Sequence, residues 1–430
     1  MKRTRVLQFG MMTALLGSGY GVMFTVLDDY RDQYGIAAHW LGLIIGIGFL
    51  AGFVSQVFLA PIADRGHARR MVMIGLALNV VGLLGMAAGE TLQPLLLARL
   101  ISGIGIGMAV PAVRRIVINE DPDNLGSNLG LLLAADVAGF AAGPAISALL
   151  VPSFGIPAPF LVIAGATVLF FPLLLRVRVT EAVEAPTKRF AFDLLRQRPI
   201  VAGLMMGSAV FLMIGTFDAL WAIVLDDLEA SEWVANIGIT LFAMPLIFLS
   251  SWGGRLAQRH GPFRLGPLGL ILGAVYMFSY GLLPTGIAMF AVGIIHGISD
   301  AITVSSTGVA IGLAAPRDRQ AGAQGLLGAA ETLTAGVTSV LAGVLYTVGG
   351  RTLAYTVCAV VMVALAAGAY WLVGPEYRNR QALHIDVDEH RTPEPSRVRV
   401  RVGAGQVRSA ARRLRRTLPA SSRTGSSTNS

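Results

Sequence analysis

Among the titratable residues inside long apolar runs, where a charged side chain costs roughly 2.5 to 3.5 kcal/mol on membrane-insertion scales, six are candidates for function. They are Arg99, Asp136, Asp218, His296, Asp300 and Glu331. Carboxyl and imidazole groups in such places can take up and release protons, and an arginine can hold a counter-charge. We therefore expect these residues to bind protons or charged solutes rather than to cleave bonds.

Two of these acids occupy equivalent places in an internal repeat. A shift of 195 residues superimposes Gly130 on Gly325 and brings Asp136 onto Glu331. Each acid follows the start of its apolar run by about eight residues, which is roughly 12 Å along a helix. Transporters built from repeats bind substrate and ions where the repeats meet, so this pair is a candidate gate or proton site. Structural pairing with an arginine from a neighbouring loop is the other interpretation.

The other four candidates also have two interpretations each. Arg99 lies about six residues from the outer end of its run, so it either faces a cavity or extends its head group to the membrane surface. Asp218, beside aromatic residues, is either a buried site for a cationic amphiphile or a proton, or a wet surface acid. His296 and Asp300, four residues apart, share one helix face as a proton relay or as a helix contact. A metal site is not expected, because no third ligand is evident.

Twelve apolar runs position these residues. The 430-residue chain is 54% hydrophobic and 14% charged, with a mean hydropathy of +0.66, which excludes a soluble globular protein. A helical span needs about 20 apolar residues. The runs cover residues 7–27, 37–59, 72–89, 94–116, 128–150, 158–175, 200–224, 234–252, 266–283, 286–311, 323–347 and 353–373. We therefore predict an all-α integral membrane protein with twelve transmembrane helices.

Charge is distributed unevenly between the connections. If both termini are cytoplasmic, the inside segments hold nearly all Lys and Arg residues, with Arg114 and Arg115 among them, and the outside loops are mainly acidic. Segments rich in Lys and Arg stay in the cytoplasm, so we predict the inner (plasma) membrane with both termini inside. The net charge of +9 and the pI of about 10.2 then reflect loops and a tail that face anionic lipid, and nucleic-acid binding is not expected.

Two related basic stretches, 194 residues apart, divide the chain into halves. The first, APIADRGHARR at residues 60–70, is centred on Asp64, and the second, GRLAQRHGPFR at 254–264, has Gln258 at the corresponding position. The first resembles the signature loop of the major facilitator superfamily, and the second resembles its weaker copy. The resemblance implies that Asp64 meets the start of the eleventh span when an inner gate is shut, although a plain orienting turn is the alternative. The loop residues assigned on this basis are Asp64, Arg65, Arg69, Arg70, Gly254, Arg259 and Gly261.

Two further motifs carry the same resemblance. ARLISGIGIG, which contains Arg99, is similar to the family's RxxxGxG pattern, in which the arginine of proton-coupled members serves proton coupling. Gly139, Gly143 and Pro144 match the core of the signature associated with antiporters, and physically they permit close helix packing and a bend. The resemblance covers nearly the whole chain and implies the MFS fold, two pseudo-symmetric six-helix bundles.

The chain divides into four parts on this basis. Residues 1–175 are the N-terminal six-helix bundle, 176–199 a cytoplasmic linker, 200–374 the C-terminal six-helix bundle and 375–430 a basic tail. The tail contains twelve Arg and no Lys, and we expect it to be disordered. A lipid-binding helix near residues 407–418, with one apolar and one basic face, is the alternative for part of it.

We predict a proton-coupled secondary transporter that exports small amphiphilic molecules by alternating access and acts as a monomer. Two other functions stay open: uptake of a nutrient such as a sugar or an organic acid, by symport or facilitation, and a non-transporting membrane sensor or scaffold. The sequence has no GxxxxGK[ST] motif, no evident nucleophile motif and no zinc pattern, so neither an enzyme nor a cofactor is expected.

Overall fold

The computed structural model describes residues 3–177, 179–181 and 185–379, and the regular structure within them is helical. The α-helices are α1 (Arg3–Thr25), α2 (Leu27–Tyr34), α3 (Ala38–Phe58), α4 (Ala68–Ala88), α5 (Leu92–Glu120), α6 (Leu125–Phe154), α7 (Pro157–Leu175), α8 (Arg198–Asp227), α9 (Glu232–His260), α10 (Pro262–Tyr280), α11 (Gly286–Ala314) and α12 (Gln320–Asn379). Four connections contain a 3₁₀-helix: η1 (Ala60–Arg65), η2 (Pro122–Asn124), η3 (Phe192–Arg196) and η4 (Arg317–Arg319).

Twelve of these segments can span a membrane. Ten of the described helices qualify by length and apolar composition, and α9, with 29 residues, is also long enough. Helix α12 holds two spans, because its backbone leaves the helical conformation at Gly349 and Gly350, the second at φ +67°. Only a residue without a side chain adopts this angle without strain. The predicted all-α membrane protein is confirmed, and the short helix α2 is an addition that was not predicted.

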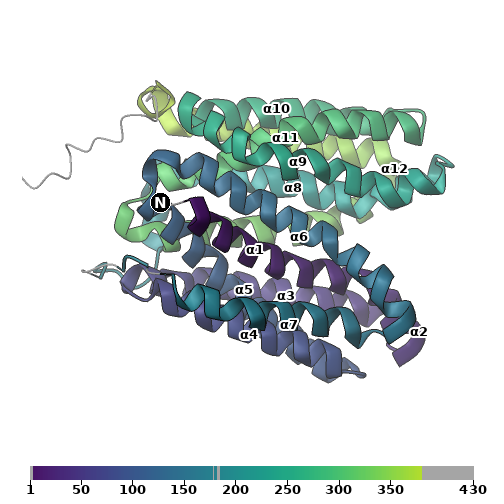
Figure 1. Cartoon of the computed structure of the whole chain (residues 1–430). Helices are drawn as coiled ribbons and strands as arrows, with labels where there is room; N and C mark the ends of the chain where they lie inside the picture. Colours follow the sequence, from purple (N-terminus) through teal and green to yellow (C-terminus); the bar gives the residue numbers. More distant parts are fainter. Residues whose placement is uncertain (1–2, 178, 182–184, 380–430) are drawn as a thin grey trace, which may run out of the picture. The chain divides into compact units, whose positions relative to one another are not determined.

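Figure 1 shows the helices in two groups, α1 to α7 and α8 to α12. In the first group α1 packs against α6, and α5 packs against α3 and α4. The second group repeats this pattern, with α8 against α12 and α11 against α9 and α10. The groups meet through two equivalent crossings, α6 with α9 and α3 with the first span of α12. The helix contacts therefore follow the repeat that was found in the sequence.

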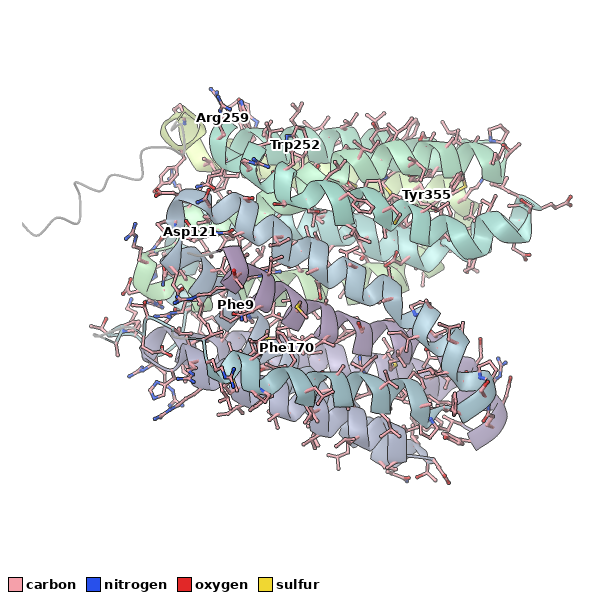
Figure 2. The ribbon with its side chains drawn as sticks, viewed as in Figure 1. Phe9, Asp121, Phe170, Trp252, Arg259 and Tyr355 are labelled. Atoms are coloured by element: carbon pink, nitrogen blue, oxygen red, sulfur yellow. The ribbon has the colours of Figure 1, made fainter. Side chains whose placement is uncertain are left out.

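We call the end of the helices that carries the four 3₁₀-helices and the turn at Gly261 the basic end, and the opposite end the acidic end. Figure 2 shows Arg259 and Asp121 at the basic end, and Tyr355 farther toward the acidic end. One buried apolar cluster at the basic end contains Val113 and Ile116 from the first half and Val309 and Ala321 from the second. The halves are therefore in close contact at the basic end.

Glycines permit the closest helix approaches. A Cβ atom added to Gly126 on α6 would lie 2.1 Å from the carbonyl oxygen of Gly254 on α9. A Cβ atom on Gly139 would lie 2.0 Å from the Ala14 carbonyl oxygen, and one on Gly143 would lie 2.4 Å from the Gly21 carbonyl carbon. Gly139 and Gly143, with Pro144 next to them inside α6, thus belong to the crossing with α1 within the first half.

The two basic stretches differ from the loops expected from the sequence. In the first, η1 ends at a turn at Gly66 with φ +79°, and Arg69 and Arg70 already belong to α4. In the second, α9 continues through Gly254 and Arg259 to His260, so the turn is confined to Gly261 at φ +93°. The left-handed angles at these glycines allow the sharp change of direction between two long helices.

The fourth predicted span also proved longer than residues 94–116. Helix α5 continues to Glu120, because apolar Ile116 to Ile118 extend the helix beyond Arg114 and Arg115. Arg114 and Arg115, which the charge count assigned to the cytoplasmic side, thus lie well inside this helix, as the bounds 94–116 already implied. The predicted basic tail beyond residue 379, including its candidate lipid-binding stretch near 407–418, lies outside the described residues.

Candidate functional site

Asp64 joins the two halves at the basic end. Its side chain is only 1% exposed, and its carboxylate accepts hydrogen bonds from the backbone N–H groups of Ala321, at 2.9 Å, and Gly322, at 2.7 Å. These N–H groups belong to the first turn of α12, where helix donors have no partner within the helix. A carboxylate there satisfies two of them and is favoured by the helix dipole.

Arg115 neutralises this carboxylate from the same half. Its Nε atom lies 3.2 Å from Oδ1 of Asp64, and both side chains are buried. The sequence analysis counted Arg115 among the charges of a cytoplasmic segment and missed this partnership. The apolar residues that follow it, Ile116 to Ile118, were the signal that the helix continues and that its side chain could point inward.

The other basic residues of the first stretch do not share this environment. Arg69 and Arg70 are exposed and Arg65 is partly exposed. The backbone N–H groups of Ala68 and Arg69, at the start of α4, donate to the Glu181 carboxylate at 3.0 and 2.8 Å. The structure thus places only Asp64, of the four predicted residues in this stretch, at the contact with α12.

Gln258 makes the equivalent contact in the second half. Its Oε1 accepts a hydrogen bond from the Gly126 N–H at 2.6 Å, and the 195-residue shift equates Gly126 with Ala321. Its Nε2 donates to the carbonyl oxygens of Pro122, at 2.9 Å, and Asp123, at 3.1 Å. A charged contact and a neutral contact therefore close the basic end at symmetry-related places. Gly254 lies in the same crossing, whereas Arg259 is exposed.

Asp136 and Glu331 lie farther inside, on α6 and α12. The Asp136 side chain is exposed even though protein atoms surround it closely, which places it in a recess within the helices. Glu331 is 7% exposed and has a hydrogen bond with Thr307 of α11. The two acids predicted from the repeat are therefore both interior, but the side chain of Asp136 is more exposed than that of Glu331.

Arg114 on α5 contacts the helix that carries Glu331. Its Nη1 donates to Oε1 of Gln324 on α12 at 3.4 Å. Arg114 was not among the predicted site residues, because it too was assigned to a cytoplasmic segment. Pairing of the acids with an arginine, one of the two interpretations of the sequence, stays a prediction.

Arg99 lies near the acidic end of α5 and is 2% exposed. Its guanidinium carbon is 4.5 Å from the centre of the Tyr20 ring, and its Nε donates to the Ile44 carbonyl oxygen at 3.4 Å. Gly48 provides room, since a Cβ atom there would lie 2.6 Å from Nη2 of the arginine. Arg99 therefore points into the first half, between α1, α3 and α5, and does not extend to the surface.

Asp218 and the aromatic residues around it in the sequence face different ways. Phe217 and Trp221 are buried in the second half with ring centres 4.8 Å apart, and Phe217 also stacks on Phe242. The Asp218 side chain is exposed, in a recess that protein atoms surround. Both interpretations of Asp218 therefore stay predictions. The acid does not share the buried position of Phe217 and Trp221, because successive helix residues point about 100° apart.

His296 and Asp300 form a buried pair on α11. The His296 Nε2 atom lies 3.4 Å from Oδ2 of Asp300, and its Nδ1 is 3.0 Å from the Tyr280 hydroxyl. Both residues are at most 2% exposed, and the Tyr276 ring packs on the imidazole at 4.8 Å. The pair is thus enclosed within the second half. In the part of the chain that the structure describes, no group of three His, Cys, Asp or Glu residues could hold a metal ion.

Comparison with known proteins gives matches along the chain. The family model of the Major Facilitator Superfamily matches residues 9–226 and 204–415. Multidrug resistance protein MdtG of Escherichia coli O9:H4 (strain HS) is 24% identical over 312 residues, which cover 66% of this chain and 74% of the relative. The MdtG of Serratia proteamaculans (strain 568) is 25% identical over 310 residues, with the same coverage.

Three solved structures share the fold. The proton:xylose symporter XylE has a TM-score of 0.71 and 15% identity, and covers 87% of this chain and 97% of its own. FucP in the outward conformation has a TM-score of 0.68 and 15% identity, with 86% and 98% covered. The human organic anion transporter MFSD10 (TETRAN) has a TM-score of 0.66 and 14% identity, with 87% and 100% covered. At these identities the likeness concerns the fold alone.

Proposed function

Because this chain belongs to the Major Facilitator Superfamily of transporters, we propose that it exports small amphiphilic molecules in exchange for protons, by alternating access. The observation that carries this proposal is the pair Asp136 and Glu331, one carboxyl group from each half at equivalent positions of the repeat. Ionisable groups inside a membrane protein are costly and mark ion or substrate pathways.

The contact of Asp64 with α12 supplies a gate in this proposal. It closes the basic end in the conformation described here, together with the Gln258 contact and the buried cluster around Val113. We place the basic end in the cytoplasm, because segments rich in Lys and Arg remain on that side. The protein would then sit in the inner (plasma) membrane with both termini inside, and the structure would represent a state closed toward the cytoplasm.

Proton coupling follows from the exposure of the interior acids. Asp136 and Asp218 are accessible in recesses, whereas Glu331 is nearly enclosed. A carboxyl group that is protonated on one side and ionised on the other can alternately release and attract a cationic substrate. His296, Asp300 and Arg99 stay candidates for a supporting role, since a movement of the halves would be needed to expose them.

Two observations support export over uptake. The relatives named multidrug resistance proteins match this chain over about two thirds of its length, and Gly139 to Pro144 match the antiporter-associated signature. Uptake of a sugar or an organic acid needs the same fold, and the sugar symporter among the structural neighbours has this fold at 15% identity. A sensor or scaffold without transport would have no need of the paired interior acids.

Transport into everted membrane vesicles tests the proposal. When respiration acidifies the vesicle interior, protons leave down their gradient and amphiphilic compounds should accumulate inside vesicles that contain the protein, and accumulation should collapse when a protonophore is added. Asp136→Asn and Glu331→Gln should each reduce gradient-driven accumulation at least tenfold, because the exchangeable proton is lost. Arg255→Gln, an exposed charge at the basic end, is the matched control.

Failure would take a recognisable form. If a panel of amphiphilic compounds shows no accumulation while a labelled sugar or organic acid enters right-side-out vesicles, uptake replaces export. Unchanged proton-driven rates in Asp136→Asn would remove this residue from the coupling site.

A further inference from the structure

A cavity lies at the acidic end of the first half, between the short helix α2 and the last turns of α6. Figure 1 shows α2 at this end of the first group. The volume of the cavity is about 570 Å³, which is within the range of pockets that hold small organic molecules. Asp29 and Gln33 line it from α2, and Ser147 lines it from α6. None of the candidate residues described above belongs to this lining.

Asp29 is the acid of α2 that has no basic partner. Arg31 pairs with the two acids on either side, since its Nη1 lies 3.3 Å from Oδ1 of Asp28 and its Nε lies 2.8 Å from Oδ1 of Asp32. Within the described part of the chain, no Lys, Arg or His residue forms an ion pair with Asp29. Partial burial and the charges of Asp28 and Asp32 raise the pKa of Asp29 above its ordinary value. A cation in the cavity would offset this unfavourable surrounding.

The polar side chains beside Asp29 leave acceptor atoms free. The Thr25 hydroxyl donates its proton to the Gly21 carbonyl oxygen at 2.8 Å, so its oxygen has lone pairs left for a ligand. The Gln33 amide nitrogen points to Oδ1 of Asp29 at 3.5 Å, which leaves Oε1 of Gln33 and Oδ2 of Asp29 as acceptors. This lining suits a positively charged group with several N–H donors.

Ser147 adds a buried hydroxyl without a partner. Its side chain is 2% exposed, and no hydrogen-bond partner for its Oγ atom is found among the described residues. Other helix hydroxyls, such as those of Ser18 and Thr167, donate to the carbonyl oxygen four residues earlier. A buried polar group without a partner is costly, and in native proteins it often binds water or a ligand. The hydroxyl of Ser147 is therefore a third polar group available at this cavity.

The end of α6 supplies both negative potential and apolar walls. The cavity touches Pro152 and Ser153 in the last turn of α6. The last carbonyl groups of a helix have no donor within the helix and form the negative end of its dipole, which favours a cation. Ala148 and Val151 provide apolar surface on the same side. A hydrocarbon body can lie there while its charged group faces Asp29.

We propose that this cavity binds the ammonium group of a small organic amine, with Asp29 as its counter-ion and Thr25, Gln33 and Ser147 as hydrogen-bond partners. The apolar part of the amine lies against Ala148 and Val151. The site lies at the acidic end, apart from the interior acids Asp136 and Glu331. The inference goes beyond the proposed export, because binding here does not depend on transport.

Binding of 4-fluorobenzylamine to the purified full-length protein tests the site. The protein is placed in phosphatidylcholine nanodiscs, and the fluorine signal is titrated after subtraction of protein-free nanodiscs. We expect saturable binding of the amine, and at least tenfold weaker binding of 4-fluorobenzyl alcohol, a neutral molecule of similar shape, because a charged donor strengthens hydrogen bonds to a carboxylate. Equal affinity for the two molecules, or the absence of saturable binding, would overturn the inference.

Variants separate the site from the general negative charge of α2. Asp29→Asn should raise the Kd of the amine at least tenfold, whereas Asp28→Asn, which removes the same charge from a more exposed residue, should change it less than threefold. Ala148→Leu keeps every polar group and should also weaken binding, because its larger side chain fills the cavity. Equal effects of Asp29→Asn and Asp28→Asn, or unchanged binding in Ala148→Leu, would contradict the assignment. In Asp136→Asn the Kd should stay within twofold of the parent, and loss of binding there would mean that an interior acid holds the probe.

An exported molecule and an amine of the outer medium are two sources of such an ammonium group, and export assays in cells distinguish them. Export of 4-fluorobenzylamine that is slower in Asp29→Asn than in Asp28→Asn would identify the exported molecule as the ligand. A change in the export of a neutral compound when hexylamine is added outside, in the parent but not in Asp29→Asn, would identify an outer amine. If the protein exports nothing, the proposed function fails, while the titration of the purified protein still decides whether this site exists.

Discussion

Replacement of Asp64 by Asn should open the basic end. The carboxylate accepts hydrogen bonds at 2.9 Å from Ala321 and 2.7 Å from Gly322, and it faces the Arg115 Nε atom at 3.2 Å. An Asn side chain has one acceptor oxygen, so one N–H group loses its partner and Arg115 loses its counter-ion. Hydrogen bonds to charged groups contribute about 1.5 to 3 kcal/mol, against about 0.5 to 1.5 kcal/mol for neutral ones.

From these contacts we expect Asp64→Asn to destabilise the closed conformation, relative to the open one, by about 3 kcal/mol. This difference corresponds to roughly a hundredfold change in the equilibrium between the two conformations. The effect should fall on the equilibrium between conformations and not on membrane insertion, since the contact forms only after both halves are folded.

Disulfide trapping across the same end measures the closed population. The Oγ atoms of Ser127 on α6 and Ser251 on α9 lie 3.0 Å apart. Cysteines at these positions, with the buried native Cys358 replaced by Ser, should form a disulfide under mild oxidant when the basic end is closed. We expect Asp64→Asn to slow this crosslinking at least tenfold and to slow transport as well.

Asp123→Asn serves as the control, because Asp123 is an exposed acid at the same end of the molecule. Its crosslinking should match that of the parent. If Asp64→Asn crosslinks as fast as the parent and transports at the normal rate, then its carboxylate does not hold the basic end shut, and the energetic reasoning fails.

Two further predictions concern the same end of the molecule. Gln258→Glu should slow the crosslinking severalfold, because a carboxylate would face the two carbonyl oxygens to which the amide now donates, at 2.9 and 3.1 Å, and about 1 to 3 kcal/mol would be lost. Asp193→Asn should lower the melting temperature of the purified protein near neutral pH, because Arg319 donates two hydrogen bonds to this carboxylate, at 2.7 and 3.1 Å. These bonds hold the pKa of Asp193 below its ordinary value, so its contribution is present above that value and is lost only as the pH falls through the lowered pKa.

Each of these two predictions has an outcome that would contradict it. Crosslinking of Gln258→Glu at the parental rate would mean that the neutral amide is not needed at this contact. For Asp193, the difference in melting temperature between Asp193→Asn and the parent should persist at pH 5 and should shrink as the pH falls below the ordinary pKa of an aspartate, about 3.9. A difference that is independent of pH would mean that the ion pair with Arg319 does not stabilise the linker.

Much of the fold follows from composition and periodicity. Twelve runs of about 20 apolar residues allow few arrangements in lipid, because backbone polar groups there must be satisfied within helices. The helix crossings agree with the shift that relates Asp136 to Glu331, since similar segments bury similar faces. The ends of the helices were less predictable. Helices α5 and α9 extend several residues past their apolar runs, because a helix can continue into water once its membrane part is formed.

Predictions of the surroundings of single side chains also differed in how well they matched the structure. The resemblance placed Asp64 near the eleventh span, and its carboxylate does lie on the first turn of α12, while its role as a gate stays a prediction. Asp218 had two interpretations, a buried site beside aromatic residues or a wet surface acid, and its side chain is exposed whereas Phe217 and Trp221 are buried. The sequence analysis missed the contacts of Arg114 and Arg115. Charged residues were grouped there by the connection nearest to them, which does not show in which direction their side chains point from a helix.

The amino-acid order alone was sufficient to establish a duplicated membrane protein with acids at matching depths, because hydropathy and repeats are properties of short segments. Only the packed molecule showed that Arg115 on α5 is the buried ion-pair partner of Asp64, and that His296 and Asp300 are enclosed by aromatic rings. Such partnerships depend on how helices that are far apart in the chain are rotated against one another. That rotation is set by the close contacts of residues such as Gly126 with Gly254, which bring together segments more than a hundred residues apart.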